Sequence, residues 1–242
     1  MENSGSVNNF SKIFFSIIIS ILFALIICEI ALRVKHKIIV NYDIEMWKYA
    51  KELKTKSENP KINHTHKKNS SATLQKVLIS TNNYGQRDKN FSIKDLKKYE
   101  RSFIVLGSSV ALGWGVGQDK TFTSFLNQIS KQEQKKWIFV NGGIGNYNTE
   151  RYVNNFIENW SQLPFTDIIV HFFVNDTEIS FNKKPNLFIE HTHLGVVIWK
   201  LINSYKSTFK QEKLKDYYFD KYTNNYKGFK VAQDELARLK KF

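Results

Sequence analysis

The chain has a single cysteine, Cys28, among its 242 residues. One thiol excludes an intramolecular disulfide, and because Cys28 lies in an apolar run, cysteine usage indicates no compartment. The sequence also lacks an internal repeat, a P-loop, a dinucleotide-binding glycine fingerprint and a set of zinc ligands. We therefore expect no cofactor and no metal ion.

Acidic residues are few beside basic ones, and the net charge is +14. A basic chain can bind nucleic acid, but these lysines are scattered among Asn, Ile and Tyr and form no basic and aromatic nucleic-acid motif. We expect no nucleic-acid partner. A basic face near an anionic membrane or an acidic glycan is the use that the charge favours.

Charged side chains are almost absent from residues 13–32, where Ser16, Ser20 and Glu29 alone interrupt the apolar run. About twenty apolar residues cross a hydrocarbon core of ~30 Å. A cleaved signal peptide would have a shorter apolar region and a small-x-small site, and a buried core helix is the other alternative. The run predicts a transmembrane helix over residues 13–33, after a tail of residues 1–12.

Residues 34–99 are mostly polar and rich in Lys and Asn, which is typical of a linker. Within this linker we expect a short helix at residues 43–53, a loop at 63–71 and an edge strand at 77–81. The remaining residues, 100–242, form the predicted globular domain.

Three apolar segments in this domain predict strands, at residues 103–106, 137–140 and 167–173. Amphipathic stretches lie between the strands, and this alternation predicts an α/β fold with a parallel sheet. The apolar residues on one face of each stretch are Phe122, Phe125, Leu126 and Ile129 in the first, and Tyr152, Val153, Phe156 and Trp160 in the second. An apolar run follows at residues 196–202, and residues 231–239 predict a terminal amphipathic helix. Tyr217, Tyr218 and Tyr226 are expected to be packing residues.

Residues 107–116 read GSSVALGWGV directly after the first strand. A serine attacks a carbonyl only if a turn exposes it, a base removes its proton and hydrogen-bond donors face the developing oxyanion. Ser109 is the candidate nucleophile. The alternative is a Gly- and Ser-rich turn without chemistry.

This stretch resembles the first conserved block of the SGNH (GDSL-like) hydrolase superfamily, Gly-Asp-Ser-(Leu)-(Thr)-x-Gly. Gly107, Ser109 and Gly113 match it, and Ser108 stands where the family has Asp. A serine there can make similar local hydrogen bonds. Residues 82–88, NNYGQRD, resemble the N-x-x-G-x-R-D lead-in of anchored relatives, and a plain β-turn is an equal alternative.

Two later stretches resemble the second and third blocks in the family's order. Residues 141–149 resemble N-x-G-x-x-G-Y-x-T, with Asn146 at the second glycine, where asparagine tolerates a left-handed backbone. Asn175 and Asp176 match the end of G-x-N-D, with Phe173 in place of the glycine. A simple glycine turn and an Asx turn are the respective alternatives.

The resemblance implies a three-layer, flavodoxin-like fold and a serine ester hydrolase or O-acyl/acetyl transferase that acts on envelope or glycan esters. Ser109 would form the acyl-enzyme. The N–H groups of Ser109 and Gly143 and the side-chain amide of Asn175 would form the oxyanion hole, with Asp176 fixing the loop.

The family's fourth block, D-x-x-H, carries the base histidine, and no such pattern follows Asn175. His191 and His193 come too soon after the third strand, and we interpret them as solvated loop residues. His171 is interpreted as a strand histidine satisfied by its neighbours. The expected fold has about five strands, so the domain is predicted to be incomplete at its C-terminal end. A catalytically inactive binding protein of the same fold, a truncated gene product and a basic anchored scaffold are the alternatives.

The orientation in the membrane rests on two opposed signals. Arg33, Lys35 and Lys37 follow the apolar run and only Lys12 and the amino terminus precede it, so the positive-inside count favours a cytoplasmic domain. The resemblance implies an exported domain. We expect export.

Overall fold

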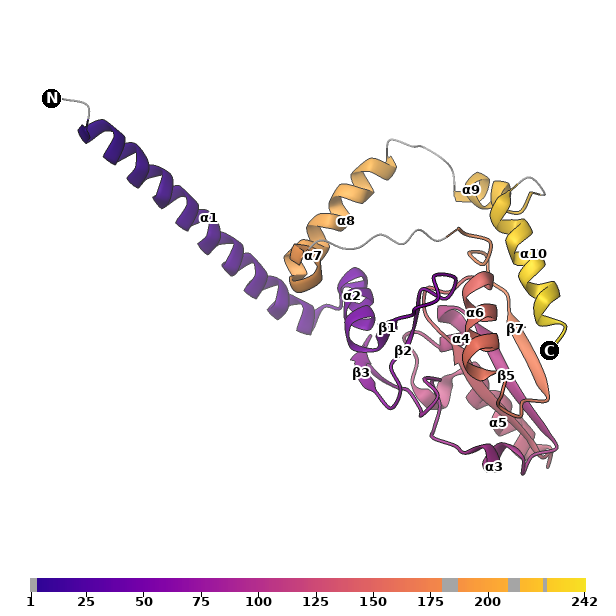
Figure 1. Ribbon diagram of the computed structural model, residues 1–242. Coiled ribbons are helices and arrows are strands. Elements are labelled where there is room, and N and C mark those ends of the chain that lie inside the picture. Colours follow the sequence, from indigo (N-terminus) through magenta and orange to yellow (C-terminus); the bar gives the residue numbers. More distant parts are fainter. Residues whose placement is uncertain (1–3, 180–186, 209–213, 224–225) are drawn as a thin grey trace. The chain divides into compact units, whose positions relative to one another are not determined.

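The computed structural model describes residues 4–179, 187–208, 214–223 and 226–242 (Figure 1). The chain divides into two compact units, residues 1–45 with 184–210 and residues 46–183 with 211–242. Of the expected N-terminal tail, residues 1–3 lie outside the described residues.

The first unit contains a long N-terminal helix, α1 (Ser4–Ile38). Its segment Ser11–Ile38 is long and apolar enough to span a membrane. Two further helices, α7 (Leu187–His191) and α8 (His193–Thr208), belong to the same unit. The expectation that His193 is a solvated loop residue is wrong, because His193 begins α8 and is buried against the ring of His36.

The second unit is built on a parallel sheet of three strands, β5 (Arg101–Gly107), β6 (Trp137–Gly143) and β7 (Asp167–His171). The strand order is β6-β5-β7. Both faces of the central strand are buried, as expected for a continuous apolar run in a parallel sheet. The predicted α/β class and parallel sheet are confirmed.

The crossovers between these strands carry the expected helices. A short helix, α4 (Ser109–Leu112), and α5 (Phe122–Gln132) connect β5 to β6, with a 3₁₀ turn at Gln118–Lys120 between them. The crossover from β6 to β7 is α6 (Thr149–Asn155), continued by a π-helical turn, Phe156–Trp160. Because the strand order reverses after β6, right-handed crossovers place α4 and α6 on opposite faces.

Helix α5 differs from its prediction. Its apolar residues Phe122, Phe125 and Ile129 are about half exposed. Its polar side turns inward instead, because β6 is an edge strand with free backbone groups. The Asn127 amide satisfies the N–H and the carbonyl of Phe139, both at 2.8 Å, and Ser130 Oγ donates to the carbonyl of Trp137 at 3.0 Å.

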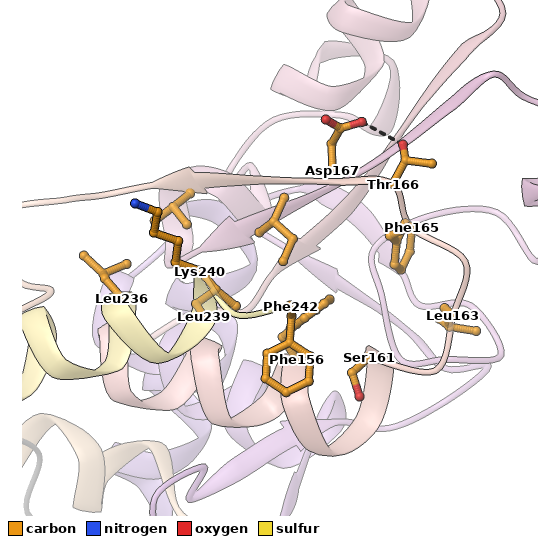
Figure 2. Close-up of a pocket in the computed structure, with 12 residues that line it drawn as sticks. Phe156, Ser161, Leu163, Phe165, Thr166, Asp167, Leu236, Leu239, Lys240 and Phe242 are labelled. Atoms are coloured by element: carbon orange, nitrogen blue, oxygen red, sulfur yellow. Dashed lines mark hydrogen bonds between the residues drawn. The ribbon is translucent and has the colours of Figure 1, made fainter.

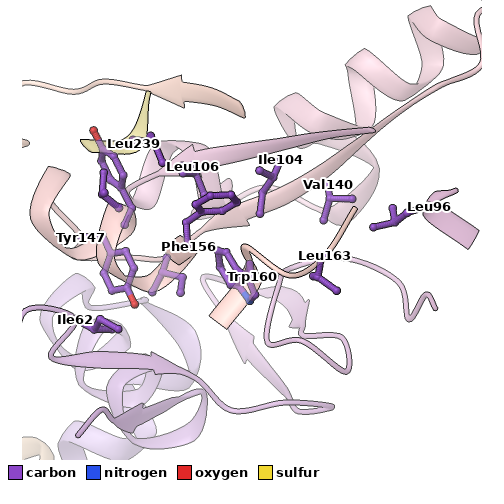
Figure 3. Close-up of a cluster of buried hydrophobic side chains, with 13 residues drawn as sticks. Ile62, Leu96, Ile104, Leu106, Val140, Tyr147, Phe156, Trp160, Leu163 and Leu239 are labelled. Carbon is purple, nitrogen blue, oxygen red and sulfur yellow. The ribbon is translucent and has the colours of Figure 1, made fainter. Parts of the chain in front are cut away.

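The main core lies between the sheet and α6, and Figure 3 shows its side chains. Helix α10 (Lys227–Leu239), which the pattern at 231–239 predicted, packs against α6 and contributes Leu239. A shorter helix, α9 (Leu214–Lys221), precedes it. The buried members of this core are Ile62, Leu96, Ile104, Leu106, Val140, Ile144, Tyr147, Tyr152, Val153, Phe156, Trp160, Leu163 and Leu239.

Most of the predicted linker is folded. Helix α2 (Tyr42–Glu52) and β4 (Val77–Ser80) match the expected helix and strand, but the expected loop at 63–71 contains β2 (His64–His66). Strand β2 pairs with β1 (Lys54–Lys56), β4 pairs with β3 (Ser71–Leu74), and α3 (Ile93–Leu96) follows. These strands are three or four residues long, too short for a clear periodic signal. They help to build a second core of Tyr49, Leu53, Ala72, Leu74, Ile79 and Leu112.

Candidate functional site

The three stretches that carry the sequence resemblance meet at one edge of the sheet. Gly107, at the carboxyl end of β5, lies opposite Gly143 of β6 and His171 of β7. Ser109, the loop after Gly143 and Asn175 all follow these ends. In open α/β sheets, ligands bind outside the carboxyl ends of the strands, where the strand order reverses.

Ser109 is the first residue of α4 and is partly exposed. Its backbone N–H therefore lies outside the helical hydrogen-bond ladder. Its Oγ makes no hydrogen bond to any described residue. Ser108 is buried and makes no side-chain cap hydrogen bond, so the local bond expected from it is not formed.

Arg87, from the lead-in segment, holds the loop that follows Ser109. Its guanidinium donates to the carbonyls of Leu112 at 2.9 Å, Gly113 at 2.5 Å and Val116 at 2.7 Å. Arg87 is fully buried, and burial lowers the pKa of its guanidinium. Gly113 has a φ of +80°, and a Cβ there would lie 3.1 Å from Arg87 Nη1, so glycine suits both the turn and the contact.

The rest of the lead-in forms a turn and a bridge to β6. Asn82 Oδ1 accepts from the N–H groups of Tyr84 and Gln86, both at 2.9 Å, and Gly85 has a φ of +78°. Asp88 Oδ2 accepts from the N–H of Asn141 at 3.3 Å. The segment is thus a turn, as one alternative held, and it also positions the loop after Ser109. Its arginine was the sequence signal for this second role.

Gly143 packs directly against α4. A Cβ on Gly143 would lie 2.2 Å from the backbone nitrogen of Leu112 and 2.6 Å from the carbonyl carbon of Ala111. Its N–H donates to Asn141 Oδ1 at 3.0 Å, so the predicted oxyanion donor is engaged in this structure. Asn146 has a φ of +67°, the left-handed conformation expected for it.

The loop after β7 brings Asn175 and Asp176 to the same edge. Asn175 Oδ1 is buried and has no hydrogen-bond partner among the described residues, so the Asx turn offered as the alternative is not formed there. Asp176 Oδ2 accepts from the N–H of Phe173 at 2.8 Å, and burial raises the pKa of this carboxyl to about 7. The carbonyl of Asp176 accepts from the N–H of Thr149 at 3.2 Å, which joins this loop to the one after β6.

His171 is the histidine nearest to this edge in the sheet register. It ends β7, and its Cβ lies 3.2 Å from where a Cβ of Gly107 would stand. The expectation that its neighbours satisfy it is wrong for Nδ1, which is buried without a partner among the described residues. No histidine nitrogen in the described part of the chain hydrogen-bonds Ser109.

A buried polar network, which no sequence pattern indicated, supports the loop after β6. The hydroxyl of Tyr49 accepts from the N–H of Gly145 at 2.8 Å and contacts Nε2 of His66 at 2.6 Å. His66 Nδ1 lies 3.0 Å from the carbonyl of Gly85. Burial lowers the pKa of His66 to about 3 and that of Lys54 to about 7. The neutral ring of His66 therefore accepts from Tyr49 and donates to Gly85.

A cavity of about 410 Å³ lies away from Ser109. Figure 2 shows it between Thr166 and Asp167, where β7 begins, and Leu239 and Phe242, at and just after the end of α10. A smaller cavity of about 170 Å³ is lined by Asp176, Asn148 and Gly228. Within the described ranges, no group of three or more His, Cys, Asp or Glu side chains is placed to hold a metal ion.

No protein-family model matches the chain, and no curated protein matches it.

Proposed function

We propose that this chain is a membrane-anchored serine ester hydrolase or O-acyl/acetyl transferase of the SGNH type, acting on envelope or glycan esters. The observation that carries the proposal is the convergence of Ser109, Gly143 and Asn175. They come from three separate stretches of sequence and follow or end three neighbouring parallel strands at the same edge.

The chemistry follows from the groups at this edge. Ser109 Oγ adds to the ester carbonyl and the alcohol leaves, which gives an acyl-serine that water or a second alcohol then releases. The N–H of Ser109 and the side-chain amide of Asn175 are the donors for the oxyanion, and the N–H of Gly143 joins them when it turns from Asn141. Asp176 orders the loop that carries Asn175.

The anchor in this proposal is α1, and the second unit is exported. A net charge of +14 on the chain then favours anionic surroundings, such as an acidic glycan or an anionic membrane surface.

A second function, a catalytically inactive binding protein for a glycan or an acylated small molecule, is favoured by two observations. The N–H of Gly143 is already bonded to Asn141. Ser109 has no histidine hydrogen-bonded to it among the described residues. Both features leave the fold intact and weaken the reaction.

Fluorophosphonate labelling of the full chain in detergent tests the proposal. We expect Ser109→Ala to abolish labelling and Ser108→Ala, its neighbour in the same loop, to retain it. Equal labelling of the Ser109→Ala variant, or no labelling of folded protein, rejects the hydrolase and leaves the binding protein. Circular dichroism of each variant confirms that the fold is kept.

A further inference from the structure

Helix α8 is fixed to the C-terminal part of α1 by a carboxylate. Glu29 of α1 accepts from the backbone N–H groups of His193 at 3.1 Å and Leu194 at 2.8 Å, the first two residues of α8. Thr192 Oγ1 accepts from the N–H of Gly195 at 2.9 Å. The amides of the first three residues of α8 are therefore satisfied by side chains, two of them by Glu29.

The position of Glu29 along α1 sets the depth in the membrane at which α8 would begin. Glu29 lies inside the segment Ser11–Ile38 that is apolar and long enough to span a membrane, less than one turn before the apolar run ends at Leu32. Arg33 Nε donates to the same carboxylate at 2.7 Å. In a spanning α1 these groups lie at the boundary between acyl chains and headgroups.

One face of α8 is apolar and exposed. Leu194, Ile198, Leu201 and Ile202 recur at intervals of four, three and one residues, which places them on one side of a helix. Leu201 is 63 % exposed and Ile202 49 %. Towards the other side of the helix, Val196 is buried and Lys200 Nζ lies 3.3 Å from Asp43 Oδ1.

We propose that α8 lies in the interface of the bilayer that α1 spans, with this apolar stripe against the acyl chains; this rests on the proposed anchoring by α1. The exposed apolar side chains of α1 must be covered by lipid, and α8 begins against that same helix. At 16 residues, about 24 Å, α8 is too short to cross the membrane and long enough to lie along it. Its exposed Trp199 suits the headgroup region.

The test uses the full chain with Cys28→Ser, reconstituted in vesicles of phosphatidylcholine and phosphatidylglycerol. A fluorophore is attached to one new cysteine at a time, at Leu201→Cys on the stripe or at Asn203→Cys on the opposite face of α8. A third label, at Ile19→Cys, reports whether α1 is surrounded by lipid or by water. Quenching by a nitroxide-bearing lipid and by aqueous iodide is then measured.

We expect lipid quenching at position 201 to exceed that at 203 by at least about threefold, and iodide quenching to show the reverse. Adding Glu29→Ala should abolish the lipid quenching at 201 and leave that at 19 unchanged. Iodide quenching at 201 with lipid quenching at 19 overturns the placement of α8 alone, whereas iodide quenching at both overturns the anchoring too. Protection of 201 from both quenchers means that protein covers the stripe, and this also overturns the proposal.

Discussion

The loops after β5 and β7 lie at the same edge of the sheet but are supported very differently. The β5 loop is held by Arg87, which binds three of its carbonyls, and by the close packing of Gly143 on α4. In the β7 loop, Asn175 Oδ1 and Asp176 Oδ1 are buried without hydrogen-bond partners among the described residues.

The two loops should therefore contribute differently to the stability of the fold and to its function. A buried polar atom without a partner costs about 1–3 kcal/mol, so these two oxygens of the β7 loop are unfavourable for the folded state. Such groups are typical of sites where the surrounding structure supports a strained or unsatisfied arrangement. We infer that the β5 loop is the rigid support of the site and the β7 loop its adaptable side. Substitutions in the two loops should therefore have unequal effects.

The largest loss of stability is expected for Arg87→Met. It removes three hydrogen bonds from a charged donor in a buried environment, which should lower the free energy of unfolding by about 3–5 kcal/mol. Urea denaturation of the full chain in detergent measures it. The control is Arg101→Met, which breaks a solvent-accessible ion pair with Asp167 and should lower the free energy of unfolding far less, because surface ion pairs contribute little. Equal losses would show that Arg87 is not the support of the loop.

Gly143→Ala should have the next largest effect and lower the free energy of unfolding by about 2–3 kcal/mol. The added Cβ meets backbone atoms of α4, which cannot move without shifting Ser109. Gly117→Ala is the matched control, because its Cβ meets only the side chain of Asp119, which is exposed and free to turn away. The same denaturation series compares them. A Gly143→Ala variant as stable as Gly117→Ala contradicts the close packing.

Asp176→Asn should change how stability depends on pH. Burial raises the pKa of Asp176 to about 7 in the folded chain, above its unfolded value of 3.8, so protonated Asp176 favours the folded state. The wild type should lose about 2 kcal/mol of unfolding free energy between pH 5 and pH 8, and the Asn variant should lose less. Asp167→Asn, at the other end of β7, is the control. Arg101 lowers the pKa of Asp167 from 3.8, so the stabilisation from Asp167 is lost only in more acidic solution, and this variant should keep the wild-type slope between pH 5 and pH 8. Identical pH profiles for Asp176→Asn and the wild type would rule out this role.

Most of the central fold could be predicted from the sequence, because its strands are continuous apolar runs and its longer helices have clear periodicity. The folded part of the linker could not, because its strands have three or four residues and its buried groups include Tyr49 and His66. Hydrogen bonds such as that between Tyr49 and Gly145 join residues far apart in sequence. No local pattern encodes them.

The sequence patterns predicted which residues follow the strand ends, but not the hydrogen bonds that these residues make. The glycine and serine turn located Ser109, and the strand ends located Gly143 and Asn175. The hydrogen bond from Gly143 to Asn141 could not be predicted, because it depends on the rotamer of one amide. That the polar side of α5 faces the sheet could not be predicted either. It follows from β6 being an edge strand, and edge positions depend on the strand order.

Asn175→Ala should have the smallest effect on stability and a large one on turnover. Its Oδ1 makes no hydrogen bond to a described residue, so the substitution removes no bond there, and loss of this buried unpaired oxygen should raise the unfolding free energy by about 1 kcal/mol. If its amide stabilises the oxyanion, hydrolysis of p-nitrophenyl acetate should fall about 10²- to 10³-fold, because that donor acts in the transition state and not in the folded ground state. Ser109→Ala sets the background rate. A loss of stability without a selective loss of turnover would place Asn175 with the structural supports, and the contrast between the two loops would no longer hold.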